Sequence, residues 1–459
     1  MHQTVVINIV GLTDSLIGPW SPNLEAFRSA GRLRTLEPTL PAVTTSVQYS
    51  MLTGVAPREH GVVGNGWYNR EYAEVHFWKQ SNHLVQAEKV WQTARQRDSS
   101  FTCANMFWWY NMYASVDYSV TPRPMYKADG RKIPDCYSRP GHLRSMLQAE
   151  LGRFPLFNFW GPFSSIESSR WIADASRIVH DRYDPTLMLI YLPHLDYGLQ
   201  KFGPDDEGVQ DSVAELDTVV GDLIRHFSRK GARIMIVSEY GIEPVDDAVH
   251  INRALREDGS VAVREEEGLE LLDAGASDAF AVADHQIAHV YLRDPGSVDR
   301  YASLLRDVDG IDIVLDRSQQ AEYGIDHERA GDLVCIADHG RWFSYYYWLN
   351  DSRAPDFARC VDIHRKPGYD PVELFINPAI TLPNAALAWR VMKKKLGLRT
   401  LMDVIPLDTS LVRGSHGRID LPPDRGPLLI TQDDASDRPD RLPCTDVREI
   451  ILEHLFEDG

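Results

Sequence analysis

Short runs of apolar, β-branched residues alternate along the chain with longer stretches of helical periodicity. The runs Val5–Val10, Leu187–Leu192 and Arg233–Val237 carry apolar side chains on both faces, which is typical of central strands in a parallel sheet. Between the last two runs, residues 209–230 place apolar side chains at helical spacing. A strand, a helix and a second strand in this order predict a βαβ unit.

The pattern therefore predicts an α/β fold with a mostly parallel, doubly wound central sheet and helices on both faces. In such sheets ligands bind beyond the carboxyl ends of the strands. We expect functional residues just after Val10, after Leu192 and after Val237.

The α/β core is expected to consist of residues 1–243 and 351–459, with a final helix over Val447–Phe456. Residues 244–350 are interpreted as an inserted, smaller cap, because short strands alternate there with polar stretches rich in Asp and Glu. The strands predicted in this cap are Ala288–Leu292, Ile311–Leu315 and Asp332–Ile336.

A segment of the expected core, residues 66–140, is dense in aromatic side chains, among them Trp108 and Trp109. Two interpretations stay open for it. The rings either pack in the core and a lid, or form a wall on which a flat substrate group stacks.

Composition excludes several classes of protein. The formal net charge of −18 argues against a nucleic acid and against an anionic membrane surface as the main partner. Five cysteines without a C-x-x-C pair indicate neither a disulfide framework nor a zinc-thiolate site. No apolar stretch approaches the roughly 20 residues of a membrane span, and the first residues resemble a strand rather than a signal peptide. We expect a cytoplasmic protein; the oligomeric state stays open.

The richest chemical signal is the segment Pro41–Asn65. A proline-rich turn delivers Thr44 to the start of an apolar helical stretch. Backbone N–H groups at a helix N-terminus stabilise a phosphoryl group and an alkoxide. Thr44 or Thr45 can equally be a helix cap.

This segment reads P-x-x-T-x(8)-T-G-x-x-P-x-x-H-G-V-V-G-N, a pattern that resembles the type I phosphodiesterase/nucleotide pyrophosphatase group of the alkaline phosphatase superfamily. Two more blocks follow in the family's order. Residues 191–204 (YLPHLDYGLQKFGP) resemble Y-x-x-x-x-D-x-x-G-H-x-x-G-P, and Gly414–Gly417 resembles G-x-H-G. Ser238 stands where the family has S-D-H-G.

The resemblance implies an alkaline phosphatase-like fold with two zinc ions and a threonine nucleophile. Thr44 falls on the nucleophile, which in the family is also a metal ligand. Asp196 and His416 fall on ligands of the second ion. Two metal ions clamp both oxygens of an in-line phosphoryl displacement.

Four of the seven expected positions differ from the family pattern. Val10 replaces an aspartate, Gln200 a histidine, and Glu239-Tyr240 the Asp-His pair. Glu239 remains a plausible carboxylate ligand, whereas valine cannot bind a metal. We therefore predict a reduced centre with fewer than two divalent ions, zinc being the most probable identity.

Weaker metal candidates are Gln200, His194, which precedes Asp196 by two residues, and His285. His285 and His289 are expected on one face of a continuous strand. Candidate substrate-binding residues are His60, Asn65, Tyr240, Trp108, Trp109, His364 and Arg365.

Two functions follow from these motifs. The first is a hydrolase acting on phosphodiester or pyrophosphate bonds of a small phosphate-containing molecule, with Thr44 as nucleophile. The second is a non-hydrolytic descendant of the same fold, which binds a small molecule or does different chemistry. Loss of metal ligands favours the second, and retention of Thr44, Asp196 and His416 favours the first.

Overall fold

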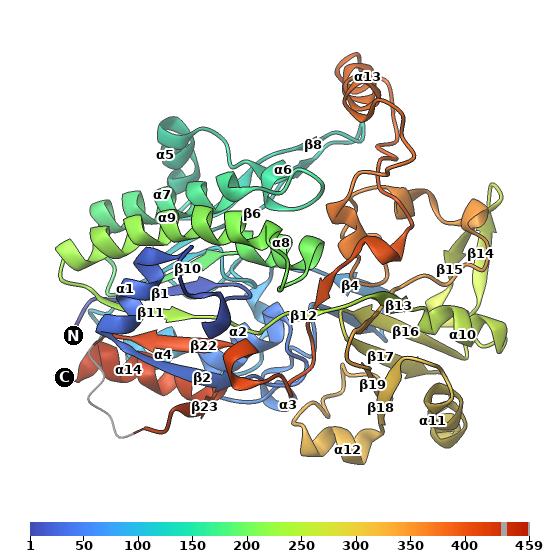
Figure 1. The fold of residues 1–459 in the computed structure, drawn as a ribbon, viewed down its shortest axis with the longest axis horizontal. Helices are drawn as coiled ribbons and strands as arrows, with labels where there is room; N and C mark the ends of the chain where they lie inside the picture. The colour runs from blue at the N-terminus through green and yellow to red at the C-terminus, as the bar shows by residue number, and fades with distance from the viewer. Residues whose placement is uncertain (433–437, 458–459) are drawn as a thin grey trace.

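A nine-stranded sheet forms the centre of the computed structural model, which describes residues 1–432 and 438–457 (Figure 1). Its strands, from one edge to the other, are β23 (Arg441–Pro443), β2 (Arg32–Glu37), β22 (Leu428–Thr431), β11 (Arg233–Val237), β1 (Thr4–Ile9), β10 (Leu187–Leu192), β5 (Cys103–Met106), β6 (Tyr118–Pro122) and β9 (Cys136–Arg139). Residues 433–437 and 458–459, which belong to the expected core, lie outside the described residues.

The middle of this sheet is parallel. Strand β1 pairs in parallel with both β10 and β11, and β10, β5 and β6 continue in the same direction. Strands β22 and β9 pair antiparallel to β11 and β6. Every residue of β1 and β10 is buried, which explains their largely apolar character. The predicted α/β fold and its three central strands are confirmed.

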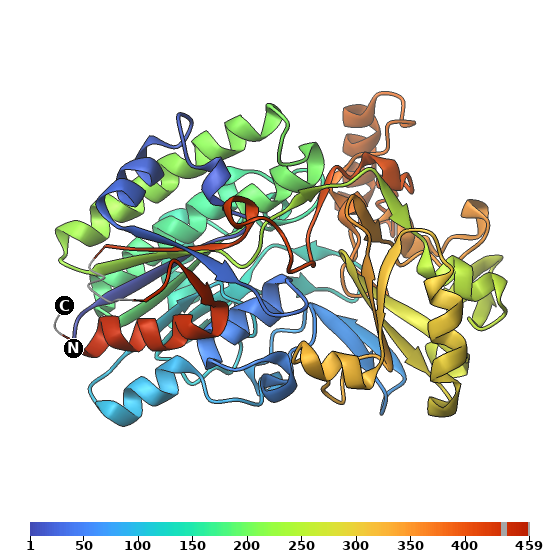
Figure 2. The same ribbon diagram turned by 60° about the horizontal axis from the view of Figure 1, so that its bottom comes forward.

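Helices cover both faces of the sheet (Figures 1 and 2). The long helices α7 (Ile166–Tyr183) and α9 (Gly208–Arg229) lie on one face, and α4 (Val90–Arg97) and α14 (Val447–Phe456) lie on the other. Helix α9 presents a stripe of buried apolar residues to the sheet, as its periodicity predicts. No helix within residues 1–432 and 438–457 has both the length and the apolar character needed to cross a bilayer.

A second, antiparallel sheet lies beside the first (Figure 1). Its order is β16 (Ala279–Asp284), β17 (Ile287–Leu292), β19 (Leu333–Ala337) and β18 (Ile311–Leu315). These bounds confirm the strands predicted in this region to within a residue. In the turn between β16 and β17, His285 packs on the rings of Tyr369 and His416.

Candidate active site

Helix α2 (Thr44–Thr53) begins at Thr44, directly after the proline-rich turn. The N-cap residue is Val43, so the Thr44 hydroxyl does not cap the helix. The side chain is almost completely buried, and its Oγ1 lies 3.1 Å from the phenol oxygen of Tyr240. The structure thus places Thr44 opposite a protein hydroxyl at the end of the central sheet.

Tyr240 and Asp196 continue the contact from Thr44. Tyr240 follows β11, and Asp196 lies in the first turn of α8 (His194–Phe202), which follows β10. The Tyr240 phenol donates a hydrogen bond to Asp196 Oδ1 at 3.3 Å. Because its single proton is directed at the carboxylate, the phenol accepts the proton of Thr44. The three groups form a hydrogen-bonded chain from Thr44 through Tyr240 to Asp196.

Burial raises the pKa of Asp196 to about 7, against hydrogen bonds from Gln200 and Tyr240 that lower it. Gln200 Nε2 donates to Asp196 Oδ2 at 2.7 Å. The Tyr369 phenol in turn donates to Gln200 Oε1 at 2.8 Å. Both carboxylate oxygens of Asp196 therefore have donors, and the group changes charge near neutral pH.

Four rings stack beside this chain. The ring centroids are 3.5 Å apart for Tyr240 and His416, 3.7 Å for His416 and His285, and 3.7 Å for His285 and Tyr369. His416 follows β21 (Gly414–Ser415) and donates from Nδ1 to the carbonyl of Ala42 at 2.8 Å. Since Tyr369 also reaches Asp196 through Gln200, the stack and the hydrogen bonds close into a ring of contacts.

Asp284 fixes His285 at the end of the stack. His285 Nδ1 donates to Asp284 Oδ1 at 2.8 Å, and the backbone N–H of Asn65 donates to Asp284 Oδ2 at 2.7 Å. Burial raises the pKa of Asp284 to about 6 and lowers the pKa values of His285 and His416 well below their ordinary value. Both imidazoles are therefore neutral.

The expectation that His285 and His289 share one continuous strand is wrong. His285 lies in the turn between β16 and β17, with φ of 61°. His289 lies within β17, where its ring nitrogens bond the backbone of Val63 and Gly331. The turn gives the two rings different surroundings. Its position could not be predicted from the spacing of residues along the strand.

Glu239 lies next to this group and is completely buried. Its Oε1 accepts hydrogen bonds from Asn8 Nδ2 at 2.7 Å and from Gln48 Nε2 at 3.0 Å, while its Oε2 is buried without a partner. Burial raises its pKa to about 7. Gln48 Oε1 also accepts from the backbone N–H of Trp109 at 3.0 Å, which ties the aromatic segment to the site.

Sequence reasoning missed Asn8, Gln48, Asp284 as the partner of Asn65, and Tyr369. Asn8 carried a signal, because it is the one amide in the buried strand β1. Tyr369 carried none, because its contact with Gln200 joins residues 169 positions apart.

Comparison with known proteins identifies the origin of this arrangement. The sequence model of the family described as type I phosphodiesterase / nucleotide pyrophosphatase matches residues 4–370. The chain belongs to this family. The prediction from the threonine segment and the two later blocks is confirmed.

Two curated phosphodiesterase relatives are similar over part of their length. One is an uncharacterized pyrophosphatase/phosphodiesterase of Schizosaccharomyces pombe, 24% identical over 255 residues, which are 53% of this chain and 45% of the relative. The other is ectonucleotide pyrophosphatase/phosphodiesterase 2 of Saccharomyces cerevisiae, 25% identical over 276 residues, which are 54% of this chain and 49% of the relative. The matches span about half the length of these relatives.

Solved structures share the fold over almost the whole chain. Phosphonoacetate hydrolase from Sinorhizobium meliloti, in complex with phosphonoformate, has a TM-score of 0.63 at 15% identity and covers 99% of this chain and 96% of its own. Murine ectonucleotide pyrophosphatase / phosphodiesterase 5, in complex with AMP, has a TM-score of 0.58 at 13% identity, with coverage of 99% and 95%. The alkaline phosphatase-like fold is therefore shown.

The residues at this site do not fit the two zinc ions that the resemblance implies. Zinc takes about four ligands, and Asp196 directs both oxygens at Tyr240 and Gln200. Among Thr44, Asp196, Glu239 and His416, only His416 Nε2 and Glu239 Oε2 are buried atoms without a hydrogen-bond partner. With both oxygens occupied, Asp196 has no oxygen directed at an ion, so these contacts do not favour the reduced centre expected from Thr44, Asp196, Glu239 and His416, which stays a prediction.

Within residues 1–432 and 438–457, one group of His, Cys, Asp and Glu brings three ligand atoms within 4.8 Å of one another. It consists of His180, Asp181 and His226 on α7 and α9, apart from the site. There Asp181 Oδ1 lies 2.9 Å from the ammonium of Lys230, which supplies the positive charge that its carboxylate needs.

Other expected site residues lie against groups outside this site. His60 bonds Ser50 and the backbone N–H of Val62. His194 faces Glu215 on α9, with Nε2 and Oε2 3.2 Å apart.

His364 and Arg365 contact residues that do not belong to the group around Thr44. His364 bonds the carbonyl of Phe77, and Arg365 pairs with Asp356. Trp108 is wholly buried in the main core, whereas Trp109 packs on Trp78 with ring centroids 4.7 Å apart. Of the expected substrate-binding residues, the structure groups Asn65, Tyr240 and Trp109 with Thr44.

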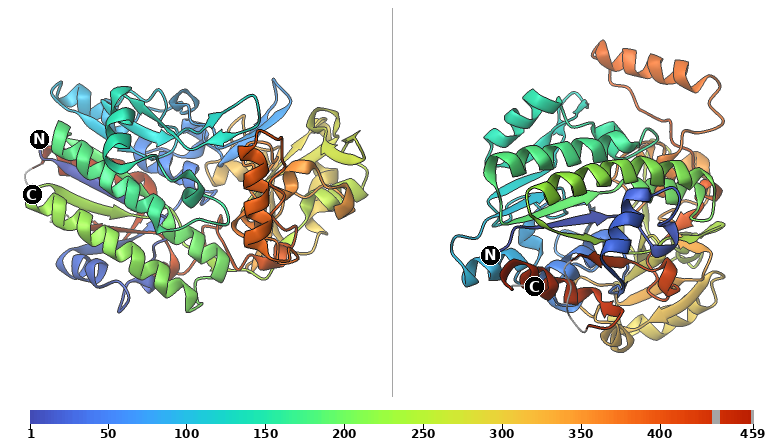
Figure 3. Two further views of the ribbon diagram at one scale, coloured as in Figure 1. Left: turned by 90° about the horizontal axis from the view of Figure 1, so that it is seen from above. Right: turned by 60° about the vertical axis from the view of Figure 1, so that its left-hand side comes forward.

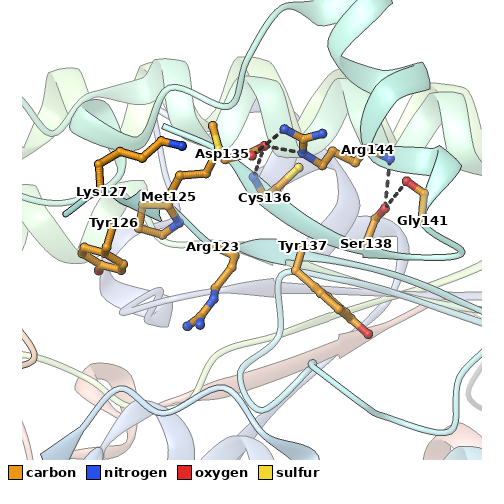
Figure 4. Close-up of a pocket in the computed structure, with 11 residues that line it drawn as sticks. Arg123, Met125, Tyr126, Lys127, Asp135, Cys136, Tyr137, Ser138, Gly141 and Arg144 are labelled. Carbon is orange, nitrogen blue, oxygen red and sulfur yellow. Dashed lines mark hydrogen bonds and ion pairs between the residues drawn. The ribbon is translucent and has the colours of Figure 1, made fainter. Parts of the chain in front are cut away.

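A cavity of about 620 Å³ lies at β7 (Met125–Tyr126) and β9, and none of the site residues line it (Figure 4). Its wall includes Arg144, which forms a two-point ion pair with Asp135 at 2.6 Å. Figure 4 shows Arg123 directed away from this pair. The cavity is thus separate from the chemistry around Thr44.

Proposed function

We propose that this chain cleaves a phosphodiester of a small molecule, with Thr44 as nucleophile and with Tyr240 and Asp196 as the path for its proton. One observation carries the proposal: Thr44 Oγ1, the Tyr240 phenol and Asp196 Oδ1 form a continuous hydrogen-bonded chain, with steps of 3.1 and 3.3 Å. A threonine hydroxyl is a weak nucleophile unless a neighbouring group removes its proton.

In the first step Thr44 Oγ1 bonds to phosphorus and the bond from phosphorus to the leaving alcohol breaks. The hydroxyl proton of Thr44 passes to Tyr240 while the phenol proton passes to Asp196. In the second step water attacks phosphorus and the bond from phosphorus to Thr44 Oγ1 breaks, while the proton on Asp196 returns along the same chain to Thr44. The proton lost by the attacking water goes to solvent, from which the alcohol that left as its anion in the first step takes a proton. The pKa of Asp196, raised to about 7 by burial, suits a group that accepts and returns a proton near neutral pH.

The charge of the site supports a phosphodiester rather than a phosphate monoester. Asp196, Glu239 and Asp284 are three buried carboxyl groups whose pKa values are raised to about 7, 7 and 6. A dianion beside them would be repelled, whereas a phosphodiester carries one negative charge. The N-terminus of α2, which begins at Thr44, favours that charge through the helix dipole.

A second candidate is a non-hydrolytic member of the family that binds a small molecule. Two observations favour it: both oxygens of Asp196 already accept hydrogen bonds from side chains, and Thr44 is only 4% exposed. The relatives that bind phosphonoformate and AMP support a phosphate-like ligand for either function.

The deciding experiment is turnover of a 4-nitrophenyl phosphodiester, followed by acid quenching and mass spectrometry for phosphothreonine at residue 44. The parent and Thr44→Ser should both release nitrophenol, and Thr44→Ala should lose several orders of magnitude in rate. Ligand binding without turnover or a covalent adduct in the parent would leave the non-hydrolytic candidate.

We also infer a reducing compartment such as the cytoplasm. All five cysteines are unpaired and buried, which is typical of proteins kept away from oxidising conditions.

A further inference from the structure

Helix α13 (Pro383–Lys395) projects from the body of the molecule (Figures 1 and 3). None of its residues is buried. A helix of this length gains little stability from its own hydrogen bonds and usually buries one face against the protein. The exposure of α13 therefore calls for a physical reason.

The exposed side of α13 is apolar. Ala385, Ala388, Trp389, Met392 and Leu396 follow one another at helical spacing and form one stripe, which we call the outer stripe. The exposed fractions are 53% for Trp389, 43% for Met392 and 71% for Leu396. Leu398 and Leu401 extend the apolar surface beyond the helix, at 56% and 47%.

Contacts on the opposite side hold the outer stripe in this orientation. Arg390 Nε pairs with Asp403 Oδ1 at 2.7 Å. Leu387 packs against a small apolar cluster that includes Val372 and Ile405. Rotating the stripe toward the body would break both contacts, so the fold presents the stripe to the surroundings.

The charge of this segment is opposite to that of the chain. Residues 382–402 contain five basic side chains, Arg390, Lys393, Lys394, Lys395 and Arg399, and no acidic one, in a chain with a net charge of −18. Arg390 is neutralised by Asp403. Within the described part of the chain, no ion pair involves Lys393, Lys394, Lys395 or Arg399.

We propose that residues 382–401 form an interfacial anchor that docks on an anionic lipid bilayer. Trp389, Met392 and Leu396 would enter the boundary between headgroups and acyl chains. On a helical wheel Lys393 and Lys395 lie on opposite flanks of Met392, where their ammonium groups reach lipid phosphates on both sides. Lys393 Nζ already lies 5.2 Å from the Trp389 ring centroid.

The net charge of the whole chain does not oppose this docking. Charges more than roughly 8 Å from the bilayer are screened at physiological ionic strength, so the local basic face decides the interaction. A tryptophan with basic residues on both flanks of an apolar stripe is the arrangement of helices that lie flat in a membrane interface. This favours a lipid surface over a protein groove.

The test is co-sedimentation of the full chain with vesicles of phosphatidylcholine alone and of phosphatidylcholine with about 30% phosphatidylglycerol. We expect binding to the anionic vesicles and at least about tenfold weaker partitioning to the neutral ones. Replacing Trp389, Met392 and Leu396 together by serine, or Lys393, Lys394 and Lys395 together by glutamate, should each reduce partitioning at least about tenfold.

Trp20→Ala is the matched control, because Trp20 is an exposed tryptophan of similar exposure, 54%, elsewhere on the surface. It should bind vesicles as the parent does, and all variants should keep the parent's melting temperature, since no altered side chain is buried. Equal binding to both vesicles, no binding, or binding unaffected by the stripe variant would overturn the proposal. A dimer that the stripe variant dissociates, without vesicle binding, would also overturn it and assign the stripe to a second copy.

Discussion

The ring of Tyr240 lies face to face with the ring of His416, with centroids 3.5 Å apart and planes 8° from parallel. By resemblance to the family, these two positions would carry ligands of two different metal ions. In contact at this distance the rings leave no room for an atom between them. The replacement of a histidine by Tyr240 therefore does more than remove a ligand, because it fills space and supplies a phenol to Thr44.

Tyr240→Phe should lower kcat for a phosphodiester by about 10²–10³-fold, because it removes the proton path while keeping the ring on His416. Unfolding free energy should fall by about 1–2 kcal/mol, since Asp196 Oδ1 loses a donor. Steady-state kinetics and urea unfolding measure the two effects. Tyr345→Phe is the control, because the Tyr345 phenol is buried without a partner. An unchanged kcat in Tyr240→Phe would exclude the phenol from the reaction.

Thr45→Ala should keep most of the parent's kcat and lose stability. The Thr45 hydroxyl, a candidate helix cap by sequence, is buried and donates to the carbonyl of Gly64 at 2.8 Å. Removing it leaves that carbonyl without its donor, at a cost of about 1–2 kcal/mol. Denaturant unfolding and initial rates of the same preparation provide the comparison. A loss of kcat as large as in Thr44→Ala would contradict the assignment of the nucleophile.

The rate should rise with pH and level off above about 7. The pKa of Asp196 is raised to about 7 by burial, and only its deprotonated form accepts the proton from Tyr240. A pH–kcat profile of the parent should therefore show one acidic limb, and Glu239→Gln should retain it. Asp196→Asn should have little activity at any pH. If the midpoint of the acidic limb of the pH–kcat profile shifts in Glu239→Gln, the titrating group is Glu239 rather than Asp196.

Turnover should survive removal of divalent metal. Asp196, an expected metal ligand, already accepts hydrogen bonds at both oxygens, so neither is directed at an ion. Dialysis against a chelator, with metal analysis before and after, should change kcat by less than about twofold. If chelation abolishes activity and added zinc or manganese restores it, the side chains rearrange around an ion. The proton path would then not be enough to activate Thr44.

Glu239→Gln should stabilise the protein at pH 8 and leave it nearly unchanged at pH 4. Burial raises the pKa of Glu239 to about 7 in the folded state, above its ordinary value in the unfolded chain. The unfolded state therefore binds fewer protons between these values, and stability falls as pH rises. A gain on the order of 2 kcal/mol is expected at pH 8. Urea unfolding at both pH values measures this gain. If the free energy of unfolding differs between variant and parent by the same amount at pH 4 and pH 8, the cause is packing rather than titration of Glu239.

The sequence by itself determined the architecture and the family. The largely apolar runs at residues 5–10, 187–192 and 233–237 are explained by burial on both faces, and this local property is visible without a structure. The threonine segment is also local, since Thr44 reaches its position from a turn and a helix start. Asp196, Glu239 and Tyr240 could likewise be predicted as site residues, because each follows the carboxyl end of a predicted strand.

Only the tertiary structure decided what these residues do together. The contact of Tyr240 with Thr44 joins positions 196 apart, and that of His416 with Ala42 joins positions 374 apart. His285 enters the stack through a turn with positive φ, in a sheet that the central strands do not specify. Ligand spacing in a sequence gives residue types, whereas metal binding depends on the directions of their atoms. Hydrogen bonds and ring packing set those directions, and they arise only when distant segments meet.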